Sequence, residues 1–149
     1  MQITYKGDYS LKAMLDLSLH YGKDVITIHG MAKRIDAPAK FLEQVLLDLK
    51  KGGFVESKRG VKGGYFLAKP PDKIVLGDVV RFVEGPVEPV PCADVKSHYK
   101  GCRDIHKCVF RGIWIDVAKA THDIIDNITF RDLADKFKTT IHSGDFYTI

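Results

Sequence analysis

The sequence lacks any apolar run approaching the roughly 20 residues that a membrane-spanning helix needs. Its N-terminal segment, MQITYKGDYS, also lacks the apolar core of a signal peptide. No phosphate-binding glycine loop of the nucleotide type and no internal repeat is present. We therefore expect a cytoplasmic protein that makes no membrane contact.

Cysteine is scarce, and its placement is uneven. The 149 residues contain three cysteines, Cys92, Cys102 and Cys108, which fall within one stretch of 17 residues. An odd number at such close spacing is a poor disulfide framework, whereas thiolate ligation of a metal in a reducing compartment fits it. The alternative is that all three are unligated thiols.

Composition and charge fit one modest domain with a basic N-terminal half. Apolar residues make up 45% and charged residues 28% of the chain, the balance of a single domain with a real core. Residues 1–70 hold 12 Lys and Arg against 7 Asp and Glu, or +5, whereas residues 71–149 hold 11 against 12, or −1. This asymmetry favours a polyanionic partner, although a solvated surface would give the same charge.

Periodicity and turn residues define a series of short elements in the first half of the chain. Asp8 or Ser10 could cap the first helix, and Gly22 could end it. Pro38 suits the first turn of a later amphipathic helix that stops at Gly52. The expected order is a helix from Leu11 to Tyr21, a short strand at 25–28, a brief helix at 31–35, a helix at about 38–51, and hairpin strands at 54–58 and 65–69.

This order is that of a winged helix-turn-helix, whose second helix enters the major groove of double-stranded DNA while the hairpin wing follows the backbone. Lys40 and Gln44 are one helical turn apart and can face a groove together. Glutamine can bond adenine bidentately, and lysine can bond guanine or phosphate. Glu43 can accept a bond from cytosine but repels phosphates, so it could reject sites. A core helix with a merely solvated polar face is the alternative.

The predicted wing strengthens the DNA-binding interpretation. Lys58, Arg59 and Lys62 lie beside glycines that allow the backbone to approach phosphates closely. We therefore expect residues 1–70 to form a DNA-binding domain, with base readers on the helix and phosphate contacts from the wing.

The second half of the chain changes character. A short helix at 76–83 and a proline-containing loop at 87–107 precede an apolar pattern that recurs at three and four over 109–128. That stripe is too broad for one contact face, so a homodimer is expected, with an intramolecular core helix as the alternative. Thr129 and Asp132 resemble a capping box for a last helix through Phe137. We expect 71–137 to hold the cysteine loop and the dimerisation helix, and 138–149 to be a flexible tail.

The run KFLEQVLLDLKKGGFVESKRGVKGGYFLAKPPDKIVLGDVVRFVEG, followed by a three-cysteine loop and a long helix containing IW, resembles the Rrf-type family of bacterial winged-helix regulators. The resemblance covers about residues 1–137. It implies a mainly α fold with a small β wing and a long dimerisation helix. It also implies a homodimeric transcriptional regulator, not an enzyme, whose loop cysteines hold an iron-sulfur cluster that tunes operator binding in response to iron-sulfur, redox or nitric oxide status.

The cysteine loop departs from the family pattern at two points. Cys102 and Cys108 keep the family's five intervening residues, but nine residues separate Cys92 from Cys102, so the loop is longer. In iron-sulfur assembly regulators of the family, a histidine three positions after the last cysteine is the fourth ligand. That position is Arg111 here, and a guanidinium cannot ligate a metal.

The resemblance therefore leaves the fourth ligand open. Asp8 matches the aspartate that reaches a 4Fe-4S cluster from the partner subunit in nitric oxide sensors of the family. His106 and His98 are competing ligands for a 2Fe-2S cluster or a zinc site. A plain helix cap is the alternative role of Asp8, and solvated loop residues are the alternative for the histidines.

Two other function classes use the same loop. A regulator with a zinc site or a thiol redox switch would need no iron. An enzyme with Cys108 as nucleophile and His106 as base is the more distant alternative, because no acidic pair or oxyanion motif accompanies them.

Overall fold

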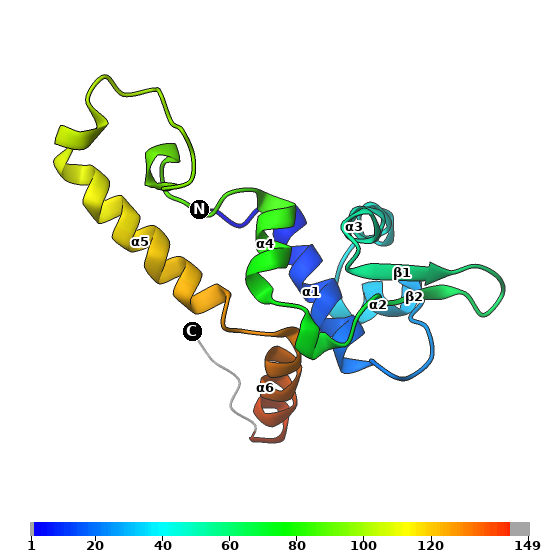
Figure 1. Cartoon of the computed structure of the whole chain (residues 1–149). Coiled ribbons are helices and arrows are strands. Elements are labelled where there is room, and N and C mark those ends of the chain that lie inside the picture. The colour runs from blue at the N-terminus through cyan, green and yellow to red at the C-terminus, as the bar shows by residue number, and fades with distance from the viewer. Residues whose placement is uncertain (1, 144–149) are drawn as a thin grey trace.

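The computed structural model describes residues 2–143 and has a helical body from which one helix and a long loop project (Figure 1). Within this range the fold is mostly helical with one small antiparallel sheet, as predicted. Short 3-10 turns lie at Pro71–Lys73 (η1), Pro91–Ala93 (η2) and Ile105–Lys107 (η3). The main elements are α1 (Tyr5–Leu19), α2 (Ile28–Ile35), α3 (Ala39–Lys51), β1 (Val55–Lys58), β2 (Gly64–Leu67), α4 (Leu76–Glu84), α5 (Val109–Ile125) and α6 (Phe130–Ser143).

The core is built around α1, which packs against α2, α3, α4 and α6. Its inner face is fully buried at Ala13 and Met14. The apolar residues of α3 recur at three and four, so they form one stripe that faces this core. That stripe consists of Leu42, Val45, Leu46 and Leu49, each no more than 1% exposed. The packing leaves the opposite, polar side of α3 in solvent.

An ion pair sets the position of α2 beside α1. Arg34 on α2 donates from Nε to Asp16 Oδ1 at 2.7 Å and from Nη2 to Asp16 Oδ2 at 2.8 Å. The Asp16 side chain is only 5% exposed, so this two-pronged contact compensates for the burial of its charge. Thr27 caps the start of α2, and Asp36 ends the helix in the left-handed conformation at φ 51°. The chain can then turn sharply into α3.

The start of α1 differs from the expected one. The cap is Thr4, whose side chain accepts a bond from the Gly7 amide at 3.2 Å, rather than Asp8 or Ser10. Glu84 on α4 decides between these candidates, because its carboxylate accepts bonds from both the backbone and the hydroxyl of Thr4. The helix therefore begins earlier than the sequence predicted.

Two other boundaries also differ. The strand expected at 25–28 is reduced to a single bridge between Ile26 and Tyr65, because Thr27 already serves as the cap of α2. The capping box at Thr129 is confirmed, with Asp132 Oδ2 accepting bonds from the backbone and hydroxyl of Thr129. However, α6 continues to Ser143 instead of ending at Phe137, so part of the segment expected to be a flexible tail is helical. The rest of that segment lies outside the described residues.

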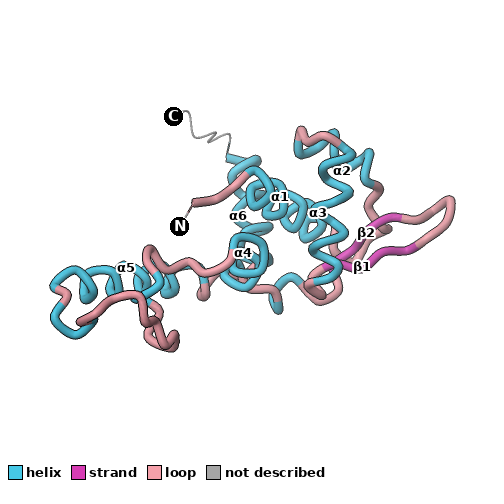
Figure 2. Tube along the Cα trace, turned by 90° about the horizontal axis from the view of Figure 1, so that it is seen from above, coloured by secondary structure: helices cyan, strands magenta, loops and turns pink. Residues whose placement is uncertain are grey.

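The hairpin forms the expected wing. β1 and β2 pair antiparallel, with Val55 opposite Leu67 and Lys58 opposite Gly64. The turn between the strands projects from the side of the body next to α3 (Figure 2). Lys50 on α3 donates to Ser57 on β1 at 2.6 Å, so the wing and α3 are tied at their bases.

Removal of the Arg34 guanidinium tests the ion pair that positions α2. We expect Arg34→Ala to lower the free energy of unfolding by about 2 kcal/mol, because it leaves a buried carboxylate without its strongest partner. Chemical denaturation followed by circular dichroism measures the change. Lys33→Ala, an exposed change on the same helical turn, should have little effect. Equal stabilities of the two variants would contradict this role of the pair.

Candidate nucleic-acid interface and cysteine loop

The outer face of α3 carries the predicted base readers. Lys40, Glu43 and Gln44 are all exposed and, being three and four residues apart, share one side of the helix. Phe41 lies at the edge of this face, where its ring packs edge-on against Tyr9 of α1 with centroids 5.4 Å apart. The three residues are thus brought together on a helix whose other side is fixed in the core.

Asp48, on the polar side of α3, makes contacts with Gln44 and Lys6 that were not predicted from the sequence. Asp48 Oδ1 accepts a bond from Gln44 Nε2 at 3.2 Å, and Asp48 Oδ2 lies 2.8 Å from Lys6 Nζ of α1. Lys51 Nζ is 3.4 Å from Asp48 Oδ1. The hydrogen bond from Lys6 is the main cause that lowers the pKa of Asp48. A glutamine four residues before an aspartate on a helix was the available signal.

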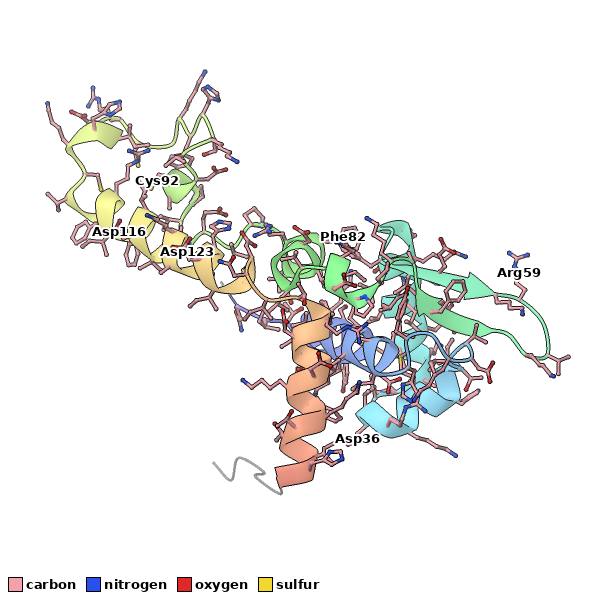
Figure 3. The ribbon with its side chains drawn as sticks, turned by 60° about the horizontal axis from the view of Figure 1, so that its bottom comes forward. Asp36, Arg59, Phe82, Cys92, Asp116 and Asp123 are labelled. Atoms are coloured by element: carbon pink, nitrogen blue, oxygen red, sulfur yellow. The ribbon has the colours of Figure 1, made fainter. Side chains whose placement is uncertain are left out.

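The wing presents its cations to solvent. Lys58, Arg59 and Lys62 are exposed, and Arg59 points away from the helical body at the turn (Figure 3). Gly60 has φ +115°, a conformation that side chains disfavour, and a Cβ on Gly63 would collide with the Lys58 carbonyl oxygen. The turn therefore needs its glycines, and it keeps the cations clear of the core.

The three cysteines lie in the loop and at the start of α5. Cys92 is half-buried in η2, whereas Cys102 and Cys108 are exposed, and all three are free thiols. Figure 3 shows Cys92 beside α5, and Arg111 Nε donates to the Cys92 carbonyl oxygen at 3.1 Å. Arg111, whose guanidinium cannot ligate a metal, thus holds the loop by a hydrogen bond.

The remaining ligand candidates are not gathered around these sulfurs. Asp8 lies in the first turn of α1, where its Oδ2 is 2.6 Å from Lys12 Nζ, and His98 and His106 are exposed in the loop. Among residues 2–143 no group of three or more His, Cys, Asp or Glu side chains is arranged to hold a metal ion. The donor chemistry still fits a thiolate-ligated cluster, because three free sulfurs share one loop.

A polar cluster joins the base of this loop to α4 and α5. His122 Nε2 lies 3.0 Å from Glu88 Oε1, and His122 Nδ1 lies 3.1 Å from Arg81 Nη1. Arg81 also donates from Nη2 to Asp126 at 2.7 Å and to Asp78 at 3.1 Å. These contacts connect the loop, the projecting helix and the helical body at one point.

The same contacts lower the pKa of two carboxyls. The hydrogen bond from His122 is the main cause that lowers the pKa of Glu88, and the hydrogen bond from Arg81 is the main cause for Asp126. The same bond to Asp126 raises the pKa of Arg81. Both carboxyls therefore lose their charge at a lower pH than ordinary Glu and Asp side chains do.

The comparison with known families identifies this architecture. A model of the Rrf2 family, described as iron-dependent transcriptional regulators, matches residues 3–136. The chain belongs to the Rrf2 family. It is a transcriptional regulator that binds DNA, and members of the Rrf2 family, which are typically dimeric, are not enzymes. Within the described part of the chain, no helix is both long and apolar enough to span a bilayer.

Relatives of this Rrf2 protein fall into more than one functional group. An Rrf2-like HTH-type regulator of Rhodobacter capsulatus is 39% identical, and the match covers 88% of this chain and 91% of the relative. IscR of Erwinia tasmaniensis is 33% identical, and the match covers 89% of this chain and 78% of that relative. The solved structure of CymR, the global cysteine regulator of B. subtilis, superposes with a TM-score of 0.76. Its sequence is 31% identical, and the match covers 91% of this chain and 98% of CymR.

The polar cluster around Arg81 predicts a specific response to acid. A carboxyl whose pKa is lowered by folding stabilises the fold above its unfolded pKa, and this stabilisation is lost as the pH falls through the lowered value. We expect Arg81→Met to be less stable than wild type at neutral pH, and the two stabilities to converge below about pH 4.

Denaturation at a series of pH values measures this convergence. Arg103→Met, which removes the same charge from an exposed loop position, serves as the control and should show no such pH-dependent difference. A constant gap between Arg81→Met and wild type from neutral to acidic pH would contradict the role of the pair with Asp126.

Proposed function

We propose that this Rrf2 regulator binds its operator as a homodimer through α3 and the wing, and that its loop cysteines hold an iron-sulfur cluster that tunes DNA binding. The observation that carries the first part is the exposed polar face of α3, with Lys40, Glu43 and Gln44 beside a cationic wing. Three free cysteines in one loop support the second part. We further propose the cytoplasm as the site of action, where thiols stay reduced.

The α3 residues have the chemistry of base readers, and the wing residues have that of phosphate binders. Gln44 can pair with adenine, and Lys40 with guanine or phosphate. Lys58, Arg59 and Lys62 can neutralise phosphates without reading sequence. Glu43 lies next to the readers and would penalise sites that bring phosphates or acceptor atoms close to its carboxylate. Movement of Glu43 with the state of the cluster would change which operators are bound.

α5 supplies the surface for the second subunit. Within α5 only Ala118 is buried, although the helix is strongly apolar. Such a face exposed to water is costly, and a second copy of the chain would cover it. The large apolar side chains exposed along α5 are Val109, Phe110, Ile113, Trp114, Val117 and Ile124.

The cluster would be held by Cys92, Cys102 and Cys108 with one further ligand. In a dimer, Asp8 of the partner chain is a candidate for a 4Fe-4S cluster, and it would have to release Lys12 to reach the metal. His106, with His98 as a further candidate, would serve a 2Fe-2S cluster or zinc instead. When bound, such a cluster supplies a centre that responds to iron supply, redox state or nitric oxide. Arg111 would fix the Cys92 end of the loop through its hydrogen bond.

A thiol switch, or a zinc site, is the second candidate function. The relative CymR is named as a cysteine regulator, and one solved structure is an oxidised form of CymR from Staphylococcus aureus. The three free cysteines of this chain would serve such a switch as well. Iron and sulfide content separates the two functions.

Base reading and phosphate binding respond differently to mutation. We expect Gln44→Ala to cost about 1–3 kcal/mol at one or two operator positions and to relax the base preference there. Removal of Arg59 or Lys62 should weaken binding to all DNA sequences alike. It should also reduce the slope of log affinity against log salt concentration by roughly one unit per lost phosphate contact. Binding titrations over operator variants and salt concentrations measure both effects. A uniform loss for Gln44→Ala would contradict its role as a reader.

The dimer follows from the exposed apolar face. Wild-type protein should sediment at twice 16.7 kDa, and Ile113→Glu should shift it toward the monomer because it places a charge in the covered face. Lys119→Glu, at an exposed polar position on α5, is the matched control. Specific operator binding by a protein that stays monomeric at micromolar concentration would refute the dimer.

Substitution of the ligands tests the cluster. After anaerobic purification, Cys92→Ala, Cys102→Ala and Cys108→Ala should each lose visible absorbance and iron, because each removes a thiolate ligand. Asp8→Ala should leave a labile or altered cluster, and Lys100→Ala in the same loop should change nothing. A silent Asp8→Ala together with an altered His106→Ala would transfer the fourth ligand to the loop histidine. Unchanged iron in all three cysteine variants would refute the cluster.

A further inference from the structure

We propose that Asp48 is a specificity-positioning residue, which fixes the side-chain amide of Gln44 in the one orientation that reads adenine and rejects guanine. The inference rests on the proposed role of Gln44 as a base reader. Asp48 itself need not contact DNA. It would set which side of the Gln44 amide, the oxygen or the NH2 group, points toward the DNA.

The geometry holds the Asp48 carboxylate from two helices. Gln44 Nε2 donates to Asp48 Oδ1 at 3.2 Å along α3, while Lys6 Nζ from α1 binds Asp48 Oδ2 at 2.8 Å. The Asp48 side chain is 21% exposed, against 44% for that of Lys6. A pair four residues apart on one helix is weak by itself, but a cation from a second helix restricts the rotamers open to the carboxylate.

The chemistry of a carboxylate selects one amide orientation. An ionised carboxylate only accepts hydrogen bonds, so the NH2 group of Gln44 must face Asp48, and Oε1 must face away. Asp48 is ionised at neutral pH, as an ordinary aspartate is, and the hydrogen bond from Lys6 lowers the pKa of its carboxyl further. The free end of Gln44 therefore presents one acceptor, Oε1, and the one remaining N–H.

This pattern matches adenine and does not match guanine. In the major groove adenine offers the N6 amino donor and the N7 acceptor, which pair with an oxygen and an N–H respectively. Guanine offers two acceptors, O6 and N7, and would need both N–H groups of the amide. Because one N–H of Gln44 already donates to Asp48, only one N–H remains, and Gln44 cannot donate to both O6 and N7 of guanine. Asp48 thus converts an ambiguous amide into a reader of adenine.

Variants at Asp48 and Lys6 test the inference on a duplex selected by wild-type protein from a random pool. The measured quantity is the ratio of affinities for adenine and guanine at the position where Gln44→Ala removes the preference. Bidentate discrimination corresponds to a ratio of about 5 to 150. We expect Asp48→Asn to lower this ratio by about threefold to tenfold, because an asparagine accepts either amide orientation. Lys6→Met should lower it less.

A structural role for Asp48 would give a different result. Asp48→Glu keeps an acceptor-only group and should retain most of the ratio. Glu56→Gln removes the same charge from an exposed position on β1 and should leave the ratio unchanged. The salt dependence of operator binding by Asp48→Asn should match that of Glu56→Gln, because both variants lose one negative charge.

Three outcomes overturn the inference, and they are distinguishable. If Gln44→Ala removes the adenine preference while Asp48→Asn and Lys6→Met retain it in full, Asp48 does not position Gln44 and the proposed base reader stands. If Gln44→Ala leaves every position unchanged, the base-reading role itself fails and takes the inference with it. Asp48→Asn that weakens all bases equally, with the ratio intact, also refutes the inference.

Discussion

The burial of the apolar side of α3 against α1 is the contact on which the rest of the interface depends. Leu42, Leu46 and Leu49 are completely excluded from solvent. A helix that is fixed by one face must present the other, so Lys40, Glu43 and Gln44 are exposed as a group. The wing is tied to the same helix by the hydrogen bond from Lys50 to Ser57. The packing of α3 against the core therefore positions both proposed DNA-contacting elements.

The projecting arm is held in a different way. α5 buries little of its own surface against the body, and polar contacts among Arg81, His122 and Glu88 connect it to α4 and to the base of the cysteine loop. Polar contacts of this kind constrain direction and can rearrange more easily than a packed core. A change in the loop could therefore reach the helical body without disrupting the α1–α3 core.

Local patterns were enough to predict α3 and the wing, because apolar spacing, Pro38 and Gly52 lie within the segment they define. The start of α1 was not predictable locally: Thr4, Asp8 and Ser10 are all acceptable caps, and the choice depends on Glu84, 80 residues away from Thr4. The ion pair of Arg34 with Asp16 and the polar cluster between α4 and α5 were not predictable locally either, because their partners lie on different helices. The exposed positions of Lys40 and Gln44 followed from helical spacing. The relative placement of the three cysteines in a long loop has no local signature, and among residues 2–143 the structure does not gather them into a metal site.

In the proposed regulator, a DNA-reading domain is joined to a cysteine loop that would report a chemical state. The most direct test uses one anaerobic preparation, analysed for iron, sulfide and visible absorbance, and then titrated against its operator before and after removal of iron. We predict stoichiometric iron and sulfide, and operator affinities that differ by about tenfold or more between the two forms, the size of a typical allosteric coupling. Absence of iron and sulfide, or equal affinities of the two forms, would contradict the claim.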